Sequence, residues 1–364
     1  MSTFASELSA PSTTFPIINA HRGAVYQAVE NTLHAFSLAI EQGARSLELD
    51  VVRLKSGELV VFHGGGNHEN PGEVSQLASH IMDRDTLSSS SDSTFLPFSS
   101  STSSPESSSS YSSSSSTCSF PSTVPESDPL HFKASPPSHA TYSEVVPNTL
   151  YIEEMTLEQV KRLKFSPTAP GIRSLLSISP PSLSSSSLLQ HCETASIPLL
   201  TDVLDLCKST DTHIALELKG TGIEHDCLTM VEESGMIHNV TFSSFHPNKT
   251  NLIRRMRCDM SIVKTAKIFD TPLPRDWIEQ TRKLKCNEAH ICFADSTSQA
   301  IELAHRNGIK VMAWFPHPIN DSIWSKFTED AALYAQVAKS GVDVMCVNKP
   351  DLLKEVLDGM TAPM

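Results

Sequence analysis

The chain has few aromatic residues, little positive charge and no long apolar run. Aromatic side chains make up 6% of its 364 residues and hydrophobic ones 39%, both below what a compact chain of this length usually carries. The deficit is concentrated in two serine-rich stretches, at about 88–126 and about 174–188. Without these stretches roughly 310 residues of ordinary apolar content remain, enough for a sizeable core.

Positive charge is scarce, because 28 Lys and Arg face 41 Asp and Glu, for a net charge of −13. Such a chain has no general attraction for nucleic acid or for an anionic membrane surface, so we expect neither as a partner. A ligand that carries phosphate must then be held by a local cationic site or by a metal ion. No run approaches the ~18 apolar residues of a transmembrane helix, and the first residues show no secretory signal. We therefore predict a cytoplasmic protein without a transmembrane segment.

The eight cysteines follow no spacing typical of a disulfide framework. In a cytosolic chain this distribution predicts reduced thiols. Cys286, His290 and Cys292 lie close together in the sequence, but their spacing matches no standard zinc site. We interpret these three residues as structural.

Strand and helix patterns alternate along most of the chain, after a flexible leader at 1–15. Early strands are predicted to end at His21 and at His63, with an alternating strand over 46–52 between them and a helix opened by Thr32. Helices are also expected at 156–163, 198–207 and 296–306. Later strands are expected at 213–218, 239–244, 261–265, 289–293, 310–315 and 342–347.

Six later strands and two early ones make about eight parallel strands with helices between them. This count predicts an α/β fold of the (β/α)8 TIM barrel type, as one domain over 16–364. The two serine-rich stretches interrupt it as disordered low-complexity insertions, because such composition cannot bury enough apolar surface. An open doubly wound sheet is the alternative, but no G-x-G-x-x-G turn follows the first strand.

Carboxylates collect where barrel strands are expected to end, which is where barrel active sites form. Glu48 and Asp50 lie two residues apart on one strand and so share a face, and Glu217 lies near the end of another strand. Three clustered carboxylates are costly to hold together without a cation. Ligation by oxygen alone favours Mg²⁺, Ca²⁺ or Mn²⁺ over zinc. We therefore predict a divalent-cation site at these three residues.

Two histidines and two cations are expected beside this metal site. His21 and His63 each end a strand, and histidine is suited to proton transfer near neutral pH. Arg22 and Lys219 supply fixed positive charge for an anion. A divalent cation, two histidines and two positively charged side chains together describe a phosphodiesterase site. Its partner would be a small phosphodiester substrate.

At these residues the chain resembles the glycerophosphodiester phosphodiesterase family. The resemblance covers the whole chain apart from the leader and the serine-rich insertions. It rests on short motifs in family order: His21-Arg22-Gly23, Glu30-Asn31-Thr32, Glu48-Leu49-Asp50-Val51, Gly57-Glu58-Leu59-Val60-Val61, His63, Glu217-Leu218-Lys219, Ser244-Phe245, Trp314 and Gly341-Val342-Asp343 followed by Pro350.

The resemblance implies a TIM barrel that hydrolyses glycerophosphodiesters, such as glycerophosphocholine, to glycerol 3-phosphate and an alcohol. It implies that His21 and His63 are the general acid and base, and that Arg22 and Lys219 face the phosphate. The family's metal carboxylates match Glu48, Asp50 and Glu217.

Two points leave alternatives open. The family usually has Asp directly after the second histidine, whereas Gly64 follows His63 here. A phospholipase C- or D-like enzyme acting on lysophospholipid, or a barrel that binds a phosphodiester without turnover, are the alternative functions. Glu30 and Trp314 are further candidates for the pocket wall, although Glu30 could instead support a helix start and Trp314 could be a core aromatic. The sequence does not indicate an oligomeric state.

Overall fold

The computed structural model describes residues 15–63, 151–165, 191–192, 194–316 and 329–361. The leader up to residue 14, both serine-rich stretches and Gly64–Gly66 lie outside these ranges. The predictions made for those segments are therefore not addressed by the structure.

Eight parallel strands form a closed barrel, which confirms the predicted fold class. Each strand pairs with the next in the order β1-β9-β8-β7-β6-β5-β4-β2, and a further pairing between β1 and β2 closes the ring. The strands are β1 (Ile17–His21), β2 (Ser46–Arg53), β4 (His213–Leu218), β5 (Val240–Ser244), β6 (Lys264–Ile268), β7 (Glu288–Cys292), β8 (Lys310–Trp314) and β9 (Val344–Val347). A ninth strand, β3 (Leu59–Val61), pairs antiparallel with the last residues of β2.

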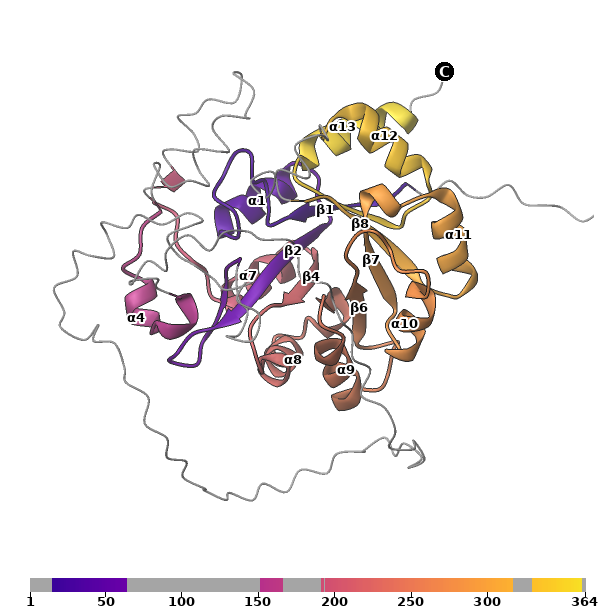
Figure 1. The fold of residues 1–364 in the computed structure, drawn as a ribbon. Helices are drawn as coiled ribbons and strands as arrows, with labels where there is room; N and C mark the ends of the chain where they lie inside the picture. Colours follow the sequence, from indigo (N-terminus) through magenta and orange to yellow (C-terminus); the bar gives the residue numbers. More distant parts are fainter. Residues whose placement is uncertain (1–14, 64–150, 166–190, 193, 317–328, 362–364) are drawn as a thin grey trace, which may run out of the picture.

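Helices follow the strands and surround the barrel, as α8 to α11 do in Figure 1. They are α1 (Leu33–Glu41), α4 (Leu157–Val160), α7 (Leu200–Ser209), α8 (Glu224–Glu233), α9 (Pro247–Met256), α10 (Trp277–Lys283), α11 (Ser298–Arg306), α12 (Ala331–Lys339) and α13 (Pro350–Thr361). The described residues also form three short 3₁₀ helices, η2 (Ile152–Glu154), η3 (Ile237–Asn239) and η4 (Phe293–Asp295).

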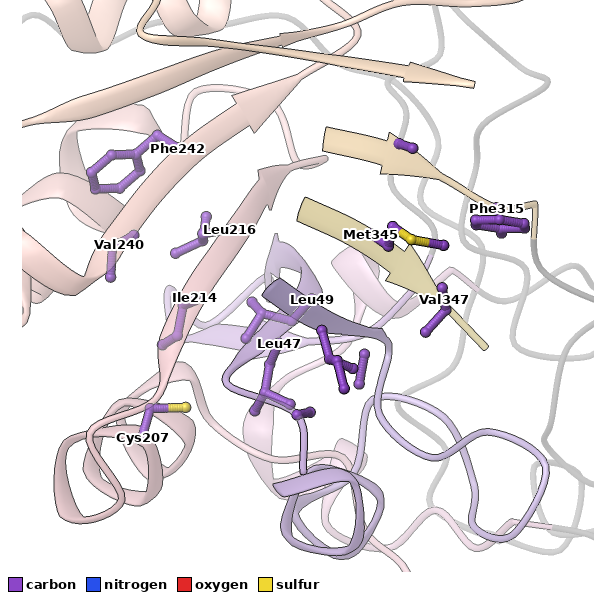
Figure 2. Packing of buried hydrophobic residues seen from close by; sticks show 14 of the residues in the cluster. Leu47, Leu49, Cys207, Ile214, Leu216, Val240, Phe242, Phe315, Met345 and Val347 are labelled. Carbon is purple, nitrogen blue, oxygen red and sulfur yellow. The ribbon is translucent and has the colours of Figure 1, made fainter. Parts of the chain in front are cut away.

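The main hydrophobic core lies between the strands and these helices. Leu47 and Leu49 of β2 pack there with Ile214 and Leu216 of β4, and Cys207 of α7 belongs to the same cluster (Figure 2). Because successive strand residues point to opposite faces, the polar residues between these leucines face the inside of the barrel. The alternation that directs the leucines into the core thus also directs the polar side chains into the barrel interior.

Several element boundaries differ from those predicted. The strand expected at 261–265 is β6, which begins three residues later at Lys264. The carboxylate of Asp259 accepts hydrogen bonds from the backbone N–H and the hydroxyl of Ser261, at 2.8 and 2.6 Å. This local turn takes up the apolar residues that periodicity assigned to the strand. Similarly, only α4 is helical in the stretch expected at 156–163, after a capping box between Thr156 and Gln159.

The cysteines mostly agree with the prediction of free thiols. Within the described residues the free cysteines are buried: Cys192, Cys207, Cys227, Cys286, Cys292 and Cys346. Cys258 is disulfide-bonded, so the prediction is wrong for that exposed residue. In the part of the chain that the structure describes, no helix is long and apolar enough to cross a membrane.

Candidate active site

The candidate site lies at the carboxyl ends of the barrel strands, where barrel enzymes place their active sites. Strand register sets its layout: His21 of β1 is level with Glu48 of β2, and Asp50 of β2 is level with Glu217 of β4. Four residues from three adjacent strands therefore meet at one side of the barrel mouth. This meeting was predicted from the alternation of β2 and the expected strand ends.

The loop after β1 has a tightly constrained backbone. Arg22 and Asn31 have φ angles of 58° and 55°, a region that residues other than glycine seldom adopt. Gly23 has φ of +90°, and a Cβ atom there would lie 2.6 Å from the carbonyl carbon of Ala35. Only glycine fits that position, which brings the loop against α1 and turns Arg22 back toward the barrel. The strain is concentrated where the site residues are held.

The three predicted carboxylates form one cluster. Glu48, Asp50 and Glu217 each offer an oxygen, and these oxygens all lie within 4.8 Å of one another. All three residues are buried, Asp50 completely. No other group of His, Cys, Asp and Glu in the described ranges is close enough to hold a metal ion.

The surroundings of the cluster make it unfavourable for all three carboxylates to carry a full negative charge. Burial raises the pKa of Glu48 well above its ordinary value, and the neighbouring Asp50 adds to the effect. Burial also raises the pKa of Glu217, against the opposing influence of Lys219. Both shifts mean that the surroundings penalise negative charge on these groups.

Two positively charged side chains partly compensate the negative charge of the cluster. Nε of Arg22 lies 3.2 Å from Asp50, and its Nη1 lies 3.3 Å from Glu30. Nζ of Lys219 lies 2.9 Å from Glu217 and 3.8 Å from Asp50. Burial alone would lower the pKa of Lys219, but the two carboxylates outweigh it and raise that pKa, so the ammonium stays charged. Both cations are thus fixed as positive charge beside the carboxylates.

The donor set fits a divalent cation. Among the described residues, buried Glu48 Oε2 and Asp50 Oδ1 accept no hydrogen bond. Such oxygens are rare in protein interiors, because an unpaired buried acceptor loses its solvation without compensation. Clustered, dehydrated carboxylate oxygens are the ligands that Mg²⁺, Ca²⁺ and Mn²⁺ prefer. Of these two residues, Glu48 also lines a cavity.

A cavity of about 290 Å³ opens beside the cluster. Its lining includes the predicted residues His21, Arg22, Glu48, His63, Glu217, Lys219 and Trp314. Asp50 lies behind this wall within the carboxylate cluster. Glu30, which was also considered for the wall, does not line the cavity but lies buried behind Arg22. The volume and the charges suit a small anionic molecule.

Several lining residues were not predicted as part of the site. They are Ser243, Phe245, Ile268, His290, Met312, Pro316 and Cys346. Phe245 and Trp314 contact edge to face, with ring centroids 6.3 Å apart, and form an aromatic corner. Most of these residues lie at inward-facing strand positions. Combining the two-residue alternation with the strand register would have found them, but the register was not available from the sequence.

Beneath the cavity a second polar cluster lies inside the barrel. His290 Nε2 lies 3.3 Å from Glu288 Oε2, and the hydroxyl of Thr241 donates to Glu288 Oε1 at 3.2 Å. His213 Nε2 lies 3.1 Å from the same hydroxyl. We call these four residues the His213–His290 chain.

A profile of the Glycerophosphoryl diester phosphodiesterase family matches residues 21–352. The chain belongs to this family. The match runs from the last residue of β1 into α13 and includes every candidate site residue, so the chain is a phosphoric diester hydrolase by family. The sequence resemblance is thereby confirmed.

Individual relatives are more distant. A glycerophosphodiester phosphodiesterase of Caldanaerobacter subterraneus subsp. tengcongensis is 20% identical over 346 residues, which is 93% of this chain and 96% of that protein. The uncharacterized protein YqiK of Bacillus subtilis is 54% identical over 46 residues, which is 13% of this chain and only 19% of that protein. That second likeness is local.

Solved structures of the family share the fold. An Oleispira antarctica phosphodiesterase, in complex with the product sn-glycerol-3-phosphate, has a TM-score of 0.57 at 18% identity, covering 94% of this chain and 97% of that one. A glycerophosphodiester phosphodiesterase from Agrobacterium tumefaciens has a TM-score of 0.57 at 16% identity, covering 93% and 99%. At these identities the likeness establishes the barrel and no more.

Proposed function

We propose that this member of the glycerophosphodiester phosphodiesterase family is a metal-dependent hydrolase that cleaves glycerophosphodiesters, such as glycerophosphocholine, to glycerol 3-phosphate and an alcohol. The observation that carries the proposal is the cluster of Glu48, Asp50 and Glu217, whose oxygens lie within 4.8 Å of one another. The cluster is combined with two histidines on the wall of one small cavity. The product seen in the Oleispira antarctica structure agrees with this substrate class.

The three carboxylates would hold the divalent cation. When bound, the cation polarises a phosphoryl oxygen and stabilises the charge that develops in the transition state. Negative charge on Glu48 and Glu217 is disfavoured by burial, and a cation would remove that penalty. The uncompensated negative charge of the carboxylates would thus favour binding of the cation that is needed for catalysis.

The chain's own residues would handle the phosphate and the protons. Arg22 and Lys219 line the cavity with fixed positive charge and would orient the phosphodiester. His21 and His63, on the same cavity, would serve as the general acid and base, one taking a proton and the other giving one. Phe245 and Trp314 would pack against the alcohol portion of the substrate.

The test is a product assay on glycerophosphocholine, glycerophosphoethanolamine and lysophosphatidylcholine, before and after removal of divalent ions. We expect chelation to abolish release of glycerol 3-phosphate, and Mg²⁺, Mn²⁺ or Ca²⁺ to restore it. Full activity of thoroughly demetallated protein would contradict the metal site. Turnover of lysophosphatidylcholine alone would favour the phospholipase alternative, and binding without turnover would favour the non-catalytic barrel.

Substitution of the histidines tests the second half of the proposal. His21→Ala and His63→Ala should each lower kcat by about two to four orders of magnitude, the usual contribution of a proton-transfer group, with little change in KM. His225→Ala is the matched control, since its side chain is 75% exposed on α8. Normal turnover by either variant would remove that histidine from the mechanism.

A further inference from the structure

The lining of the cavity divides into a charged part and an apolar part. The charged side chains come from His63 after β3 and from the ends of β1, β2 and β4, which are neighbours in the ring. The apolar side chains come from β6, from β8 and from the residues after β5 and β8. We call this part the apolar wall; it consists of Phe245, Ile268, Met312, Trp314 and Pro316. Ser243, His290 and Cys346 complete the lining.

A buried lysine outside the cavity holds two residues of the apolar wall. Because Ile268 faces the cavity, the preceding residue of β6, Lys267, points away from it. Lys267 is 8% exposed. Its Nζ donates to the backbone carbonyl of Phe245 at 2.6 Å and to that of Ile268, also at 2.6 Å. One ammonium group thus joins the main chains of two wall residues that belong to different strand ends.

The position of Lys267 explains why it can make this connection. The ladder between β5 and β6 ends at the pair of Ser244 and Lys267, so the ammonium continues the link between the two strands by one residue. Burial lowers the pKa of Lys267, against the opposing influence of Asp270. A buried ammonium held by carbonyls is therefore costly, and such a residue indicates that the geometry it maintains is needed.

The ring of Phe245 is held between the two parts of the cavity. On one side it meets Trp314 edge to face, with ring centroids 6.3 Å apart. On the other side Nζ of Lys219 lies 5.5 Å from its centroid. Since the carbonyl of Phe245 is bound to Lys267, a change at Lys267 would shift this ring relative to Trp314.

We propose that Lys267 is a positioning residue for Phe245 and Ile268, and that the apolar wall so completed selects phosphodiesters whose alcohol carries a quaternary, N-methylated ammonium. This inference rests on the proposed hydrolysis. Methyl groups bury apolar surface against the wall, and aromatic rings attract a quaternary ammonium. A primary ammonium would lose hydrogen bonds to water that apolar side chains cannot replace. Arg22 and Lys219 repel both kinds of cation, so they do not distinguish between them.

The preference for one alcohol over another is the measurement that separates positioning from a general structural role. With Mg²⁺, native protein should show a kcat/KM for glycerophosphocholine about 10-fold or more above that for glycerophosphoethanolamine. Lys267→Met, which removes the charge and the donors, should reduce this preference to less than about threefold and leave kcat on glycerophosphoethanolamine within about threefold. Equal loss of kcat/KM on both substrates would overturn the role of Lys267.

Lys264→Met is the matched control. Lys264 lies on the same strand and also donates to a backbone carbonyl, that of His238, but it does so at the opposite end of the barrel. This variant should keep the native preference.

A double-mutant cycle tests whether Lys267 acts through Phe245. Phe245→Leu should itself reduce the preference for glycerophosphocholine, because it removes an aromatic face of the wall. Adding Lys267→Met to Phe245→Leu should change the preference by less than about twofold, since the two residues then act on one feature. Fully additive losses would contradict the proposal.

Two further measurements keep the proposal testable. If Lys267→Met does not fold, Lys267→Gln should show an intermediate preference, because its single amide donor group is shorter and cannot hold both carbonyls. Calorimetric binding of phosphocholine and phosphoethanolamine needs no hydrolysis. Tighter binding of phosphocholine that Lys267→Met or Lys267→Gln weakens, in a protein that cleaves neither diester, would keep this inference and reject the proposed function. Equal cleavage of both diesters by the native protein would keep the function and reject this inference.

Discussion

Strand β4 contributes to two largely buried polar clusters that differ in how their charges are compensated. Near its carboxyl end Glu217 belongs to the carboxylate cluster, whereas at its first residue His213 belongs to the His213–His290 chain. Burial raises the pKa of Glu217. In the second cluster burial opposes ionisation of Glu288, but hydrogen bonds and charge from His290 outweigh it and lower that pKa. The first cluster disfavours the charge of Glu217, whereas the second favours the charge of Glu288.

We interpret this difference as that between a ligand-binding site, the carboxylate cluster, and a structural element, the His213–His290 chain. Each carboxylate oxygen of Glu288 is matched by a group that can donate, His290 on one side and Thr241 on the other. The carboxylate cluster leaves two buried oxygens without such a donor among the described residues. Buried oxygens without a hydrogen-bond donor are retained in a folded protein where a bound ligand compensates them. Departures from the usual satisfaction of buried polar groups are therefore most often found at functional sites.

Removing one carboxylate from each cluster should give the largest contrast. Glu48→Gln removes one of three repelling charges, so metal-free protein should keep or raise its melting temperature while Mg²⁺ affinity and activity fall by about 100-fold. Glu288→Gln should lower the free energy of unfolding by about 2 kcal/mol through loss of hydrogen bonds to a charged group. Its melting temperature should still rise with Mg²⁺, because cation binding stabilises only the folded site.

Calorimetry with and without Mg²⁺, together with the product assay, measures both effects. Each variant is the control for the other, since both replace a glutamate on an inward-facing strand position, with side-chain exposures of 11% and 12%. If metal-free Glu48→Gln were destabilised as much as Glu288→Gln, the two clusters would not differ in the way described.

A smaller effect is expected from acid, and it should arise in the His213–His290 chain. Burial lowers the pKa of His213 from 6.5 to about 4, against the opposing influence of Glu288. Between these values the unfolded chain binds more protons than the folded one, so stability falls as the pH is lowered from 6.5 to 4. His213→Gln should reduce that fall by about 1 kcal/mol or more.

Urea unfolding across this pH range checks the expectation. His225→Gln, an exposed change on α8, should keep the native pH dependence. A slope unchanged in His213→Gln would mean that this histidine does not titrate during unfolding, and the second cluster would then lose its role in acid stability.

The smallest effect is expected from deleting residues 88–126. Their composition predicts almost no contribution to the core, so the melting temperature should shift by less than about 2 °C and both clusters should remain intact. Calorimetry and the product assay on the deletion variant are the measurements. A loss of several degrees would show that this serine-rich stretch packs against the barrel.

Much of the candidate site could be predicted from the sequence because it depends on local rules. Glu48 and Asp50 share a face since side chains alternate along a strand, and Leu47 and Leu49 occupy the core on the other face. Short motifs around His21 and His63 added the family and its expected chemistry, and both residues line the cavity. The start of β6 was predicted wrongly because apolar periodicity does not register the turn that Asp259 forms with Ser261.

The sequence by itself determined the strand count, the barrel class and which residue types face its interior, because these follow from periodicity along a few consecutive residues. Only the tertiary structure decided which distant groups touch: that Asn348 lies against His21, that Glu30 lies behind Arg22, and that His290 lies against Glu288. Such contacts depend on the register between strands and on the closure of the ring. Both are set by the packing of the whole chain and leave no local pattern in the sequence.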